Sequence, residues 1–222
     1  MAQPVPPRYL GVWRRSLLRT PDRTDATSWV HWLQTEHWHG DLRVPADGNR
    51  RLAQGFGGLT TVAQPDPARP EVCTWHRHID LEPPRPTPDE GHMVFEGDDR
   101  VVETGVHGPY LEVWERVPES LGPTLALVRG PAHAPELFLI AGRCAMHLRP
   151  AERRADFRIA YGLLDGDHWN ITRTTSPCIS ACTKEVLAQP PTSTRASSRP
   201  HCARQAWRWR QISGRASRPT SP

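Results

Sequence analysis

The 222-residue sequence has no long apolar run, few cysteines and no apolar leader. No segment approaches about 18 consecutive apolar residues, so we expect no membrane-spanning helix. The N-terminal Met-Ala-Gln-Pro-Val-Pro-Pro lacks the apolar core of a signal peptide. The five cysteines, Cys73, Cys144, Cys178, Cys182 and Cys202, are odd in number and scattered. Such a set does not make a disulfide framework and fits a reducing compartment, so these absences predict a cytoplasmic protein.

Helical periodicity is also missing, and short runs with alternating side chains take its place. The 24 prolines and 16 glycines lie mostly between these runs, where turns need them. The runs cover residues 9–18, 27–35, 38–44, 56–62, 72–81, 92–96, 100–104, 110–117, 125–128, 136–148, 157–161 and 168–174. Residues 117–120 hold a turn, and Gly55, Gly57 and Gly58 indicate a bulge or sharp bend. Ten to twelve such runs are typical of an all-β meander, barrel or sandwich.

The composition changes near residue 176. Residues 176–222 hold eight Ser, four Thr and six Pro, and their seven Arg and one Lys against one Glu give a charge of +7. Of the total +4, residues 1–175 therefore carry −3, which argues against nucleic-acid binding by the folded part. We expect a disordered Ser/Pro/Arg-rich tail, because it cannot bury enough apolar surface to order itself. Two alternatives are a basic tail that touches nucleic acid or acidic surfaces, and a tail read out of frame.

Several motifs resemble those of a little-characterised family of lipocalin-like proteins in bacteria and fungi, typified by a yeast protein of unknown function. They are Gly11-Val12-Trp13-Arg14-Arg15, His31-Trp32-Leu33-Gln34-Thr35, Asp41-Leu42-Arg43-Val44-Pro45, Cys73-Thr74-Trp75-His76-Arg77, Gly105-Val106-His107 and Glu112-Val113-Trp114-Glu115-Arg116. The resemblance implies one antiparallel, lipocalin-like β-barrel of about ten strands over residues 8–175, after a flexible N-terminus at 1–7. It brings no accepted catalytic residues.

The resemblance also implies a role for the first Trp. In lipocalins generally, the Trp of a first-strand Gly-x-Trp packs across the closed end of the barrel, often under an Arg from the last strand. The matching positions are Trp13 and Arg173. Trp13 is then expected to plug one end of the barrel rather than to act in a site.

Trp and Arg recur two residues apart, which places them on the same face of a strand. The pairs are Trp13 with Arg15, Trp75 with Arg77, and Trp114 with Arg116. If these faces point inward, indole and guanidinium groups form a cavity suited to a small amphiphilic or anionic ligand. The alternative is structural: each Arg stacks on Trp at the barrel rim and is neutralised by Glu112, Glu115 or Asp80.

Two His-x-His pairs, His37 with His39 and His76 with His78, offer an alternative chemistry. Two imidazoles on one strand face can present metal ligands, as in a cupin-like metal-dependent enzyme. Gly40-Asp41 follows His39 where a cupin motif has its Glu, so ordinary hydrogen-bonded histidines are the competing interpretation.

Motifs for covalent or cofactor chemistry are missing. The sequence has no Gly-x-Ser-x-Gly, no phosphate-binding loop and no dinucleotide fingerprint. Cys73 and His76 fall on opposite faces of a strand, so they do not form a local dyad. We therefore predict a ligand-binding, non-enzymatic barrel without a cofactor, with the His-based enzyme and a protein–protein interaction module as alternatives. The oligomeric state stays open.

Overall fold

The computed structural model describes residues 3–151, 153, 156–166, 168–175 and 210–212. The described residues are almost entirely antiparallel β-structure, as predicted, and include three single-turn 3₁₀ helices. The helices are η1 (Pro7–Tyr9), η2 (Arg50–Leu52) and η3 (Pro118–Ser120). The expected turn at residues 117–120 contains η3. None of the helices in the described part of the chain is long and apolar enough to cross a membrane.

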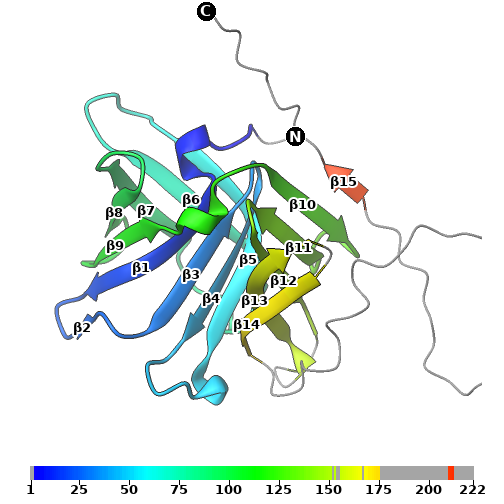
Figure 1. Cartoon of the computed structure of the whole chain (residues 1–222). Helices are drawn as coiled ribbons and strands as arrows, with labels where there is room; N and C mark the ends of the chain where they lie inside the picture. Colours follow the sequence, from blue (N-terminus) through cyan, green and yellow to red (C-terminus); the bar gives the residue numbers. More distant parts are fainter. Residues whose placement is uncertain (1–2, 152, 154–155, 167, 176–209, 213–222) are drawn as a thin grey trace, which may run out of the picture.

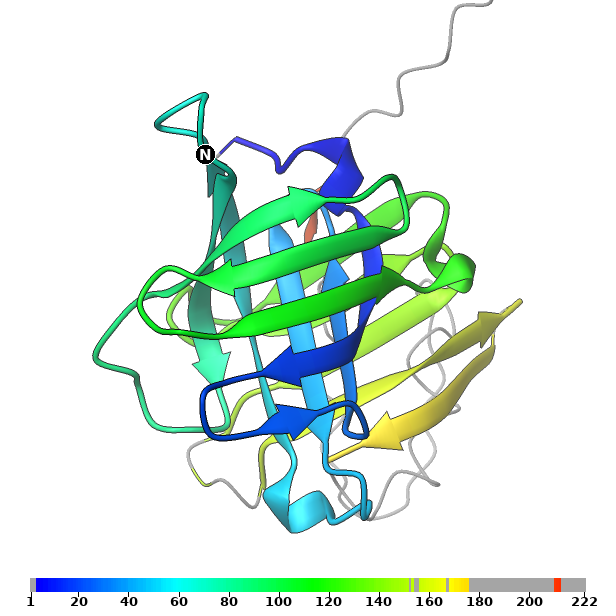
Figure 2. The same cartoon turned by 90° about the vertical axis from the view of Figure 1, so that its left-hand side faces the viewer.

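The first nine strands make one sheet, which closes into a barrel (Figures 1 and 2). They are β1 (Gly11–Arg19), β2 (Thr24–Asp25), β3 (Trp29–Gln34), β4 (Trp38–Val44), β5 (Gln54–Ala63), β6 (Glu71–Asp80), β7 (Asp89–Phe95), β8 (Arg100–Gly105) and β9 (Leu111–Arg116). β1 pairs with both β3 and β9, so eight strands form the closed barrel and the short β2 extends it beside β1.

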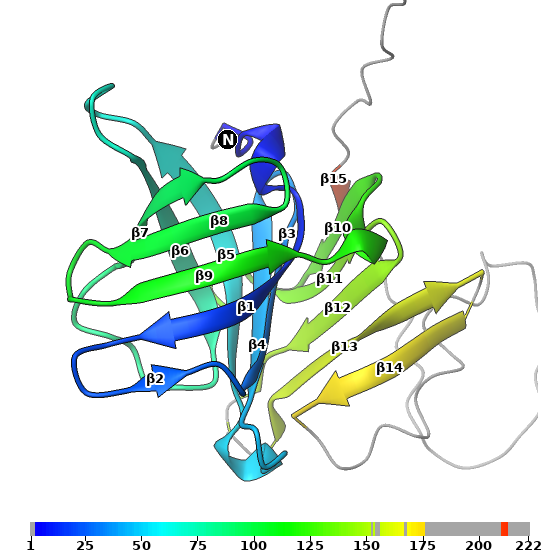
Figure 3. The same cartoon turned by 60° about the vertical axis from the view of Figure 1, so that its left-hand side comes forward.

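A second antiparallel sheet packs beside the barrel (Figure 3). It contains β10 (Thr124–Arg129), β11 (Glu136–Ala141), β12 (Cys144–Arg149), β13 (Arg158–Asp165), β14 (His168–Thr174) and β15 (Arg210–Ile212). The sequence predicted one barrel over residues 8–175, whereas the barrel closes at residue 116 and residues 124–174 form this separate sheet. The alternating pattern is the same in both, so it cannot show which strand closes the ring.

Two local features differ from the strand prediction. The run 136–148 is two strands, because Gly142 at φ 54° lies in a tight turn that joins β11 to β12. Most of the expected tail, residues 176–222, lies outside the described residues. Its described part, Arg210–Ile212, pairs with β10.

The main apolar core lies between the outer face of the barrel and the second sheet. Val12, Leu33 and Leu42 from the barrel meet Leu139 and Leu148 from the sheet, and all five are fully buried. Two glycines allow this contact. A Cβ atom at Gly40 or Gly57 would come within 3 Å of the Leu148 side chain. The predicted bulge also occurs here: the β5–β6 register shifts between Gly57 and Gly58.

The second core fills one end of the barrel interior. Trp13, Trp32, Trp75 and Trp114 pack there, with Trp32 at 5.4 Å from Trp75 and 5.8 Å from Trp114 between ring centroids. Tyr9 of η1 closes this end against Trp32 and is fully buried. The polar part of the interior lies at the opposite end of the barrel.

Candidate functional site

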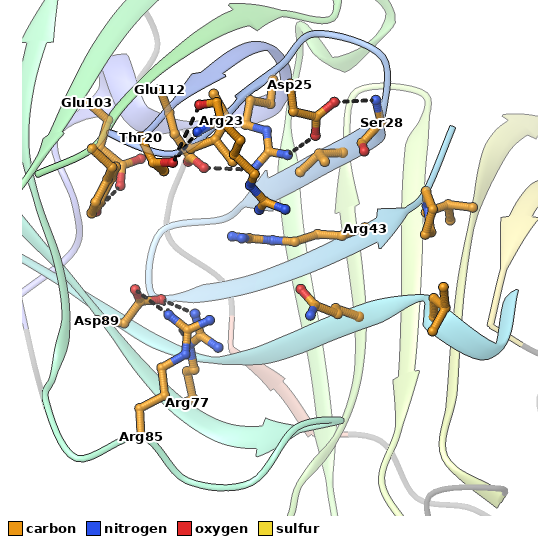
Figure 4. A pocket seen from close by; sticks show the side chains of 18 residues that line it. Thr20, Arg23, Asp25, Ser28, Arg43, Arg77, Arg85, Asp89, Glu103 and Glu112 are labelled. Atoms are coloured by element: carbon orange, nitrogen blue, oxygen red, sulfur yellow. Dashed lines mark hydrogen bonds and ion pairs between the residues drawn. The ribbon is translucent and has the colours of Figure 1, made fainter. Parts of the chain in front are cut away.

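A cavity of about 430 Å³ occupies the open end of the barrel, which we call the mouth (Figure 4). This volume is in the range of small-molecule sites in proteins. Five arginines and four acidic residues line it: Arg15, Arg23, Arg43, Arg77, Arg85, Asp25, Asp89, Glu103 and Glu112. The remaining lining residues are Leu18, Thr20, Ser28, Val30, Val44, Pro45, Leu52, Gln54 and Tyr110.

Arg15 of β1 lies on one wall of the mouth, held by two carboxylates. Its Nη1 donates to Glu112 at 2.7 Å and its Nη2 to Asp25 at 3.1 Å, and the side chain is only 6% exposed. Burial raises the pKa of Asp25, but hydrogen bonds from Thr27 and Ser28, together with Arg15, bring it well below its usual range. Asp25 therefore stays ionised, and this ion-pair network fixes the orientation of Arg15.

Arg77 of β6 forms the opposite wall. Its guanidinium donates to Asp89 at 2.6 and 2.9 Å and to Asp80 at 3.0 Å, and stacks 3.4 Å from the centroid of the Phe56 ring. The β5–β6 register jumps from Arg77 to Ile79, so His78 is the extra residue of a bulge. The bulge brings Asp80 to the interior face beside Arg77 and leaves Ile79 in the outer core.

Arg43 of β4 reaches between the two walls. In Figure 4 its side chain lies between the group around Asp25 and Glu112 and the group around Asp89 and Arg77. Asp41 accepts from its Nε at 2.7 Å and from its Nη2 at 3.3 Å. Desolvation acts to lower the pKa of Arg43, but Asp41 and Glu112 outweigh it and raise the pKa further above its usual range. Arg43 is thus a permanent cation in the middle of the cavity.

The rim of the mouth carries two further arginines and an apolar side chain. Arg23 lies in the turn between β1 and β2, and Arg85 lies before β7, 4.0 Å from Asp89. The Leu52 side chain in η2 is 60% exposed. Within the described residues Arg23 makes no ion pair, so its guanidinium is open to a ligand that enters the mouth.

The structure separates the six predicted ligand residues into three groups. Trp13, Trp75 and Trp114 point inward and pack together at the closed end of the barrel, so they leave no apolar space for a ligand there. Arg15 and Arg77 both line the mouth, where Glu112 pairs with Arg15 and Asp80 with Arg77, as the structural alternative expected. Glu115, the other predicted partner, instead bonds Arg14.

Arg116, the last of the six, lies at the closed end. Its guanidinium stacks 4.2 Å from the Trp13 ring centroid and donates to the carbonyl oxygens of Leu10, Arg8 and Asp98. The resemblance implied that Arg173 stacks over Trp13. In the structure, the Arg173 guanidinium instead lies 5.6 Å from the centroid of the Trp29 ring. The reason is the closure: β9, and not β14, is the last strand of the barrel.

The four histidines of the metal alternative have separate surroundings. His39 is fully buried, and its Nδ1 lies 3.0 Å from Thr60 Oγ1. Burial holds its pKa well below the usual range. The exposed His76 bonds Thr61 at 2.9 Å, while His78 packs edge-on against Trp38, and His37 is half-buried. No group of three or more metal-ligating side chains gathers in the part of the chain that the structure describes.

The sequence prediction missed most of the polar residues that line the mouth, although the alternation of side chains along the strands indicates some of them. On β4, Asp41 and Arg43 lie on one face and Leu42 lies on the other. On β9, Glu112 and Trp114 lie on one face and Val113 lies on the other. A same-face argument would have placed Arg43 inside with Asp41. Arg23 and Arg85 lie in turns, where no such periodicity exists.

The fold is similar to that in the crystal structure of the uncharacterized protein YLR301w from Saccharomyces cerevisiae. The TM-score is 0.57 at 12% sequence identity, over 85% of this chain and 91% of that chain. At this identity the likeness shows the fold alone. No protein-family model matches the chain, and no curated protein matches it.

Proposed function

We propose that this protein binds a small polar anion in the mouth of the barrel and does not act on it chemically. The observation that carries the proposal is Arg43, whose guanidinium extends into the cavity and bonds Asp41 through Nε and Nη2. A guanidinium held in place by an ion pair is a strong donor to carboxylate or phosphate oxygens. Arg23 at the rim adds a second cation.

The shape of the interior restricts the ligand. Because four tryptophans fill the closed end, the barrel has no space for a long acyl chain. Of the amphiphilic and anionic ligands that the sequence suggested, only a compact polar molecule fits. The carboxylates of Asp25, Asp89 and Glu112 line the same cavity and accept hydrogen bonds from ligand hydroxyl groups. A hydroxylated acid, such as a sugar acid, supplies both the anionic group and the hydroxyls.

Calorimetric titration with D-gluconate and with sulfate tests the proposal. We expect saturable binding of at least one anion, weakened about three- to tenfold by Arg23→Gln through the loss of one exposed charge-assisted hydrogen bond. The matched control is Arg69→Gln in the exposed loop between β5 and β6, which should leave the affinity unchanged. Equal weakening by both substitutions, or no binding at millimolar concentrations, would reject the proposal.

A further inference from the structure

Glu103 is a buried carboxyl group on the inner wall of the mouth that makes no ion pair within the described residues. It lies on β8, is 4% exposed and lines the cavity. Trp114 Nε1 donates to its Oε2 at 3.0 Å, and the Tyr110 hydroxyl lies 2.7 Å from its Oε1. By contrast, the side chains of Asp25 and Asp89, which line the same cavity, each have an arginine in direct contact.

The hydrogen atom of Tyr110 has two competing acceptors. The hydroxyl lies 3.3 Å from the carbonyl oxygen of Glu90 as well as 2.7 Å from Glu103. A hydroxyl has one hydrogen, so an ionised Glu103 would leave one of these acceptors without it. A protonated Glu103 allows both contacts to be hydrogen bonds: its O–H donates to the Tyr110 oxygen, and Tyr110 donates to the Glu90 carbonyl, which also accepts from the Val106 amide at 3.4 Å.

The charges around Glu103 act in the same direction. Glu112 is its direct cross-strand partner on β9, and Asp89 of β7 also faces the cavity. Burial and then Glu112 raise the pKa of Glu103 to about 8, against the opposing effects of the Tyr110 hydrogen bond and of Arg43. Arg15 is already engaged by Glu112 and Asp25, so it does not neutralise Glu103 directly.

We infer that Glu103 is the residue that sets the charge of the ligand the mouth accepts: it carries a proton when an anion is bound, and its ionisation excludes the anion. The inference rests on the proposed function. With Glu103 neutral, the charges at the mouth balance. The five lining arginines are matched by the lining carboxylates Asp25, Asp89 and Glu112 and by Asp41 and Asp80, which pair with Arg43 and Arg77. An ionised Glu103 adds a buried negative charge beside Glu112, which repels the incoming anion.

The test is calorimetric titration at several values between about pH 7 and about pH 9. D-gluconate and sulfate are suitable probes because neither changes its charge in this range. If the protonated protein alone binds, affinity for the anion falls about tenfold from pH 7 to pH 9. Glu103→Gln keeps a neutral amide between Tyr110 and Trp114, and its affinity should change less than twofold. The exposed Glu96→Gln is the control and should keep the tenfold fall.

Two outcomes would overturn the inference. One is a wild-type affinity that does not fall with pH, and the other is the same fall in Glu103→Gln as in the wild type. If no anion binds, the proposed function fails, and carbon-13 NMR of the glutamate carboxyl groups still decides the protonation of Glu103. A resonance missing from Glu103→Gln that titrates near pH 8 supports the protonated acid, and one that titrates near pH 4 to 5 overturns it.

Discussion

At the scale of single residues, some ionisable side chains inside the protein are charged and paired, and others are neutral. Arg15, Arg43 and Arg77 keep their charges because carboxylates lie within hydrogen-bond distance. The buried His31, in contrast, carries no charge. It packs against the Trp29 and Tyr161 rings, at 4.0 and 4.8 Å between centroids, and burial lowers its pKa to about 3. His31 thus stays neutral in the folded protein.

His31 predicts a loss of stability in acid. As pH falls below about 6.5, the unfolded imidazole takes up a proton, whereas the folded one stays neutral down to about pH 3. Unfolding therefore takes up a proton over this window, and the free energy of unfolding falls by about 1 kcal/mol per pH unit from this residue. His31→Phe should remove that contribution, as measured by urea unfolding between about pH 6.5 and 4. An exposed imidazole, His133, offers the control substitution, and an unchanged slope in His31→Phe would contradict the account.

The candidate site could be predicted in part from single residues. The two-residue spacing of Trp and Arg predicted that the members of each pair share one strand face, because side chains alternate along a strand, and left open whether that face points inward. In the structure Trp75, Arg77 and Trp114 lie inside the barrel. It could not divide the interior into a filled end and an open end. That division depends on η1, which brings Tyr9 over the tryptophans, and on the arrangement of strands around the closed barrel.

At the scale of elements, the bulge between β5 and β6 shapes the mouth. It places Arg77 and Asp80 together on the inside, although they are three residues apart and a regular strand would separate them. The glycines at 55, 57 and 58 did predict a bulge. The position of the extra residue, His78, was not predictable, because it lies on the partner strand, where no glycine marks it.

Gly58 is the residue of the bulge least able to accept a side chain. A Cβ atom there would lie 1.8 Å from the carbonyl oxygen of His76, a clash with backbone that a rotamer change cannot relieve. We expect Gly58→Ala to lower the free energy of unfolding by about 2–4 kcal/mol. Gly108→Ala is the control, because no atom lies within 4 Å of a Cβ at Gly108, and its effect should stay within about 0.5 kcal/mol. Equal effects in denaturant titrations would show that the bulge tolerates a side chain.

At the scale of the whole molecule, the barrel and the second sheet share one core. The all-β antiparallel class was predictable from the alternating runs, and most strands begin and end close to the expected residues. The closure of β1 on β9 was not predictable, since β1 pairs with β9 through a register shift between Arg15 and Leu17. Local patterning carries no information about such a long-range partner.

The shared core predicts cooperative unfolding. Leu148 is fully buried between the second sheet and the barrel, so Leu148→Ala should cost about 2–5 kcal/mol of unfolding free energy. Tryptophan fluorescence and far-ultraviolet circular dichroism should report the same single transition. Leu121→Ala, at a side chain that is 63% exposed, should cost less than about 0.5 kcal/mol. Two separate transitions in the Leu148 variant would mean that the sheet unfolds independently of the barrel.

We propose that the mouth of the barrel binds a small anion through Arg43. A crystal structure of the protein grown with D-gluconate at about pH 7 tests it most directly. We expect the ligand carboxylate within hydrogen-bond distance of Arg43 Nη1, with hydroxyl groups facing Asp89 or Glu112. A mouth that holds only water, or gluconate bound elsewhere on the molecule, would contradict it.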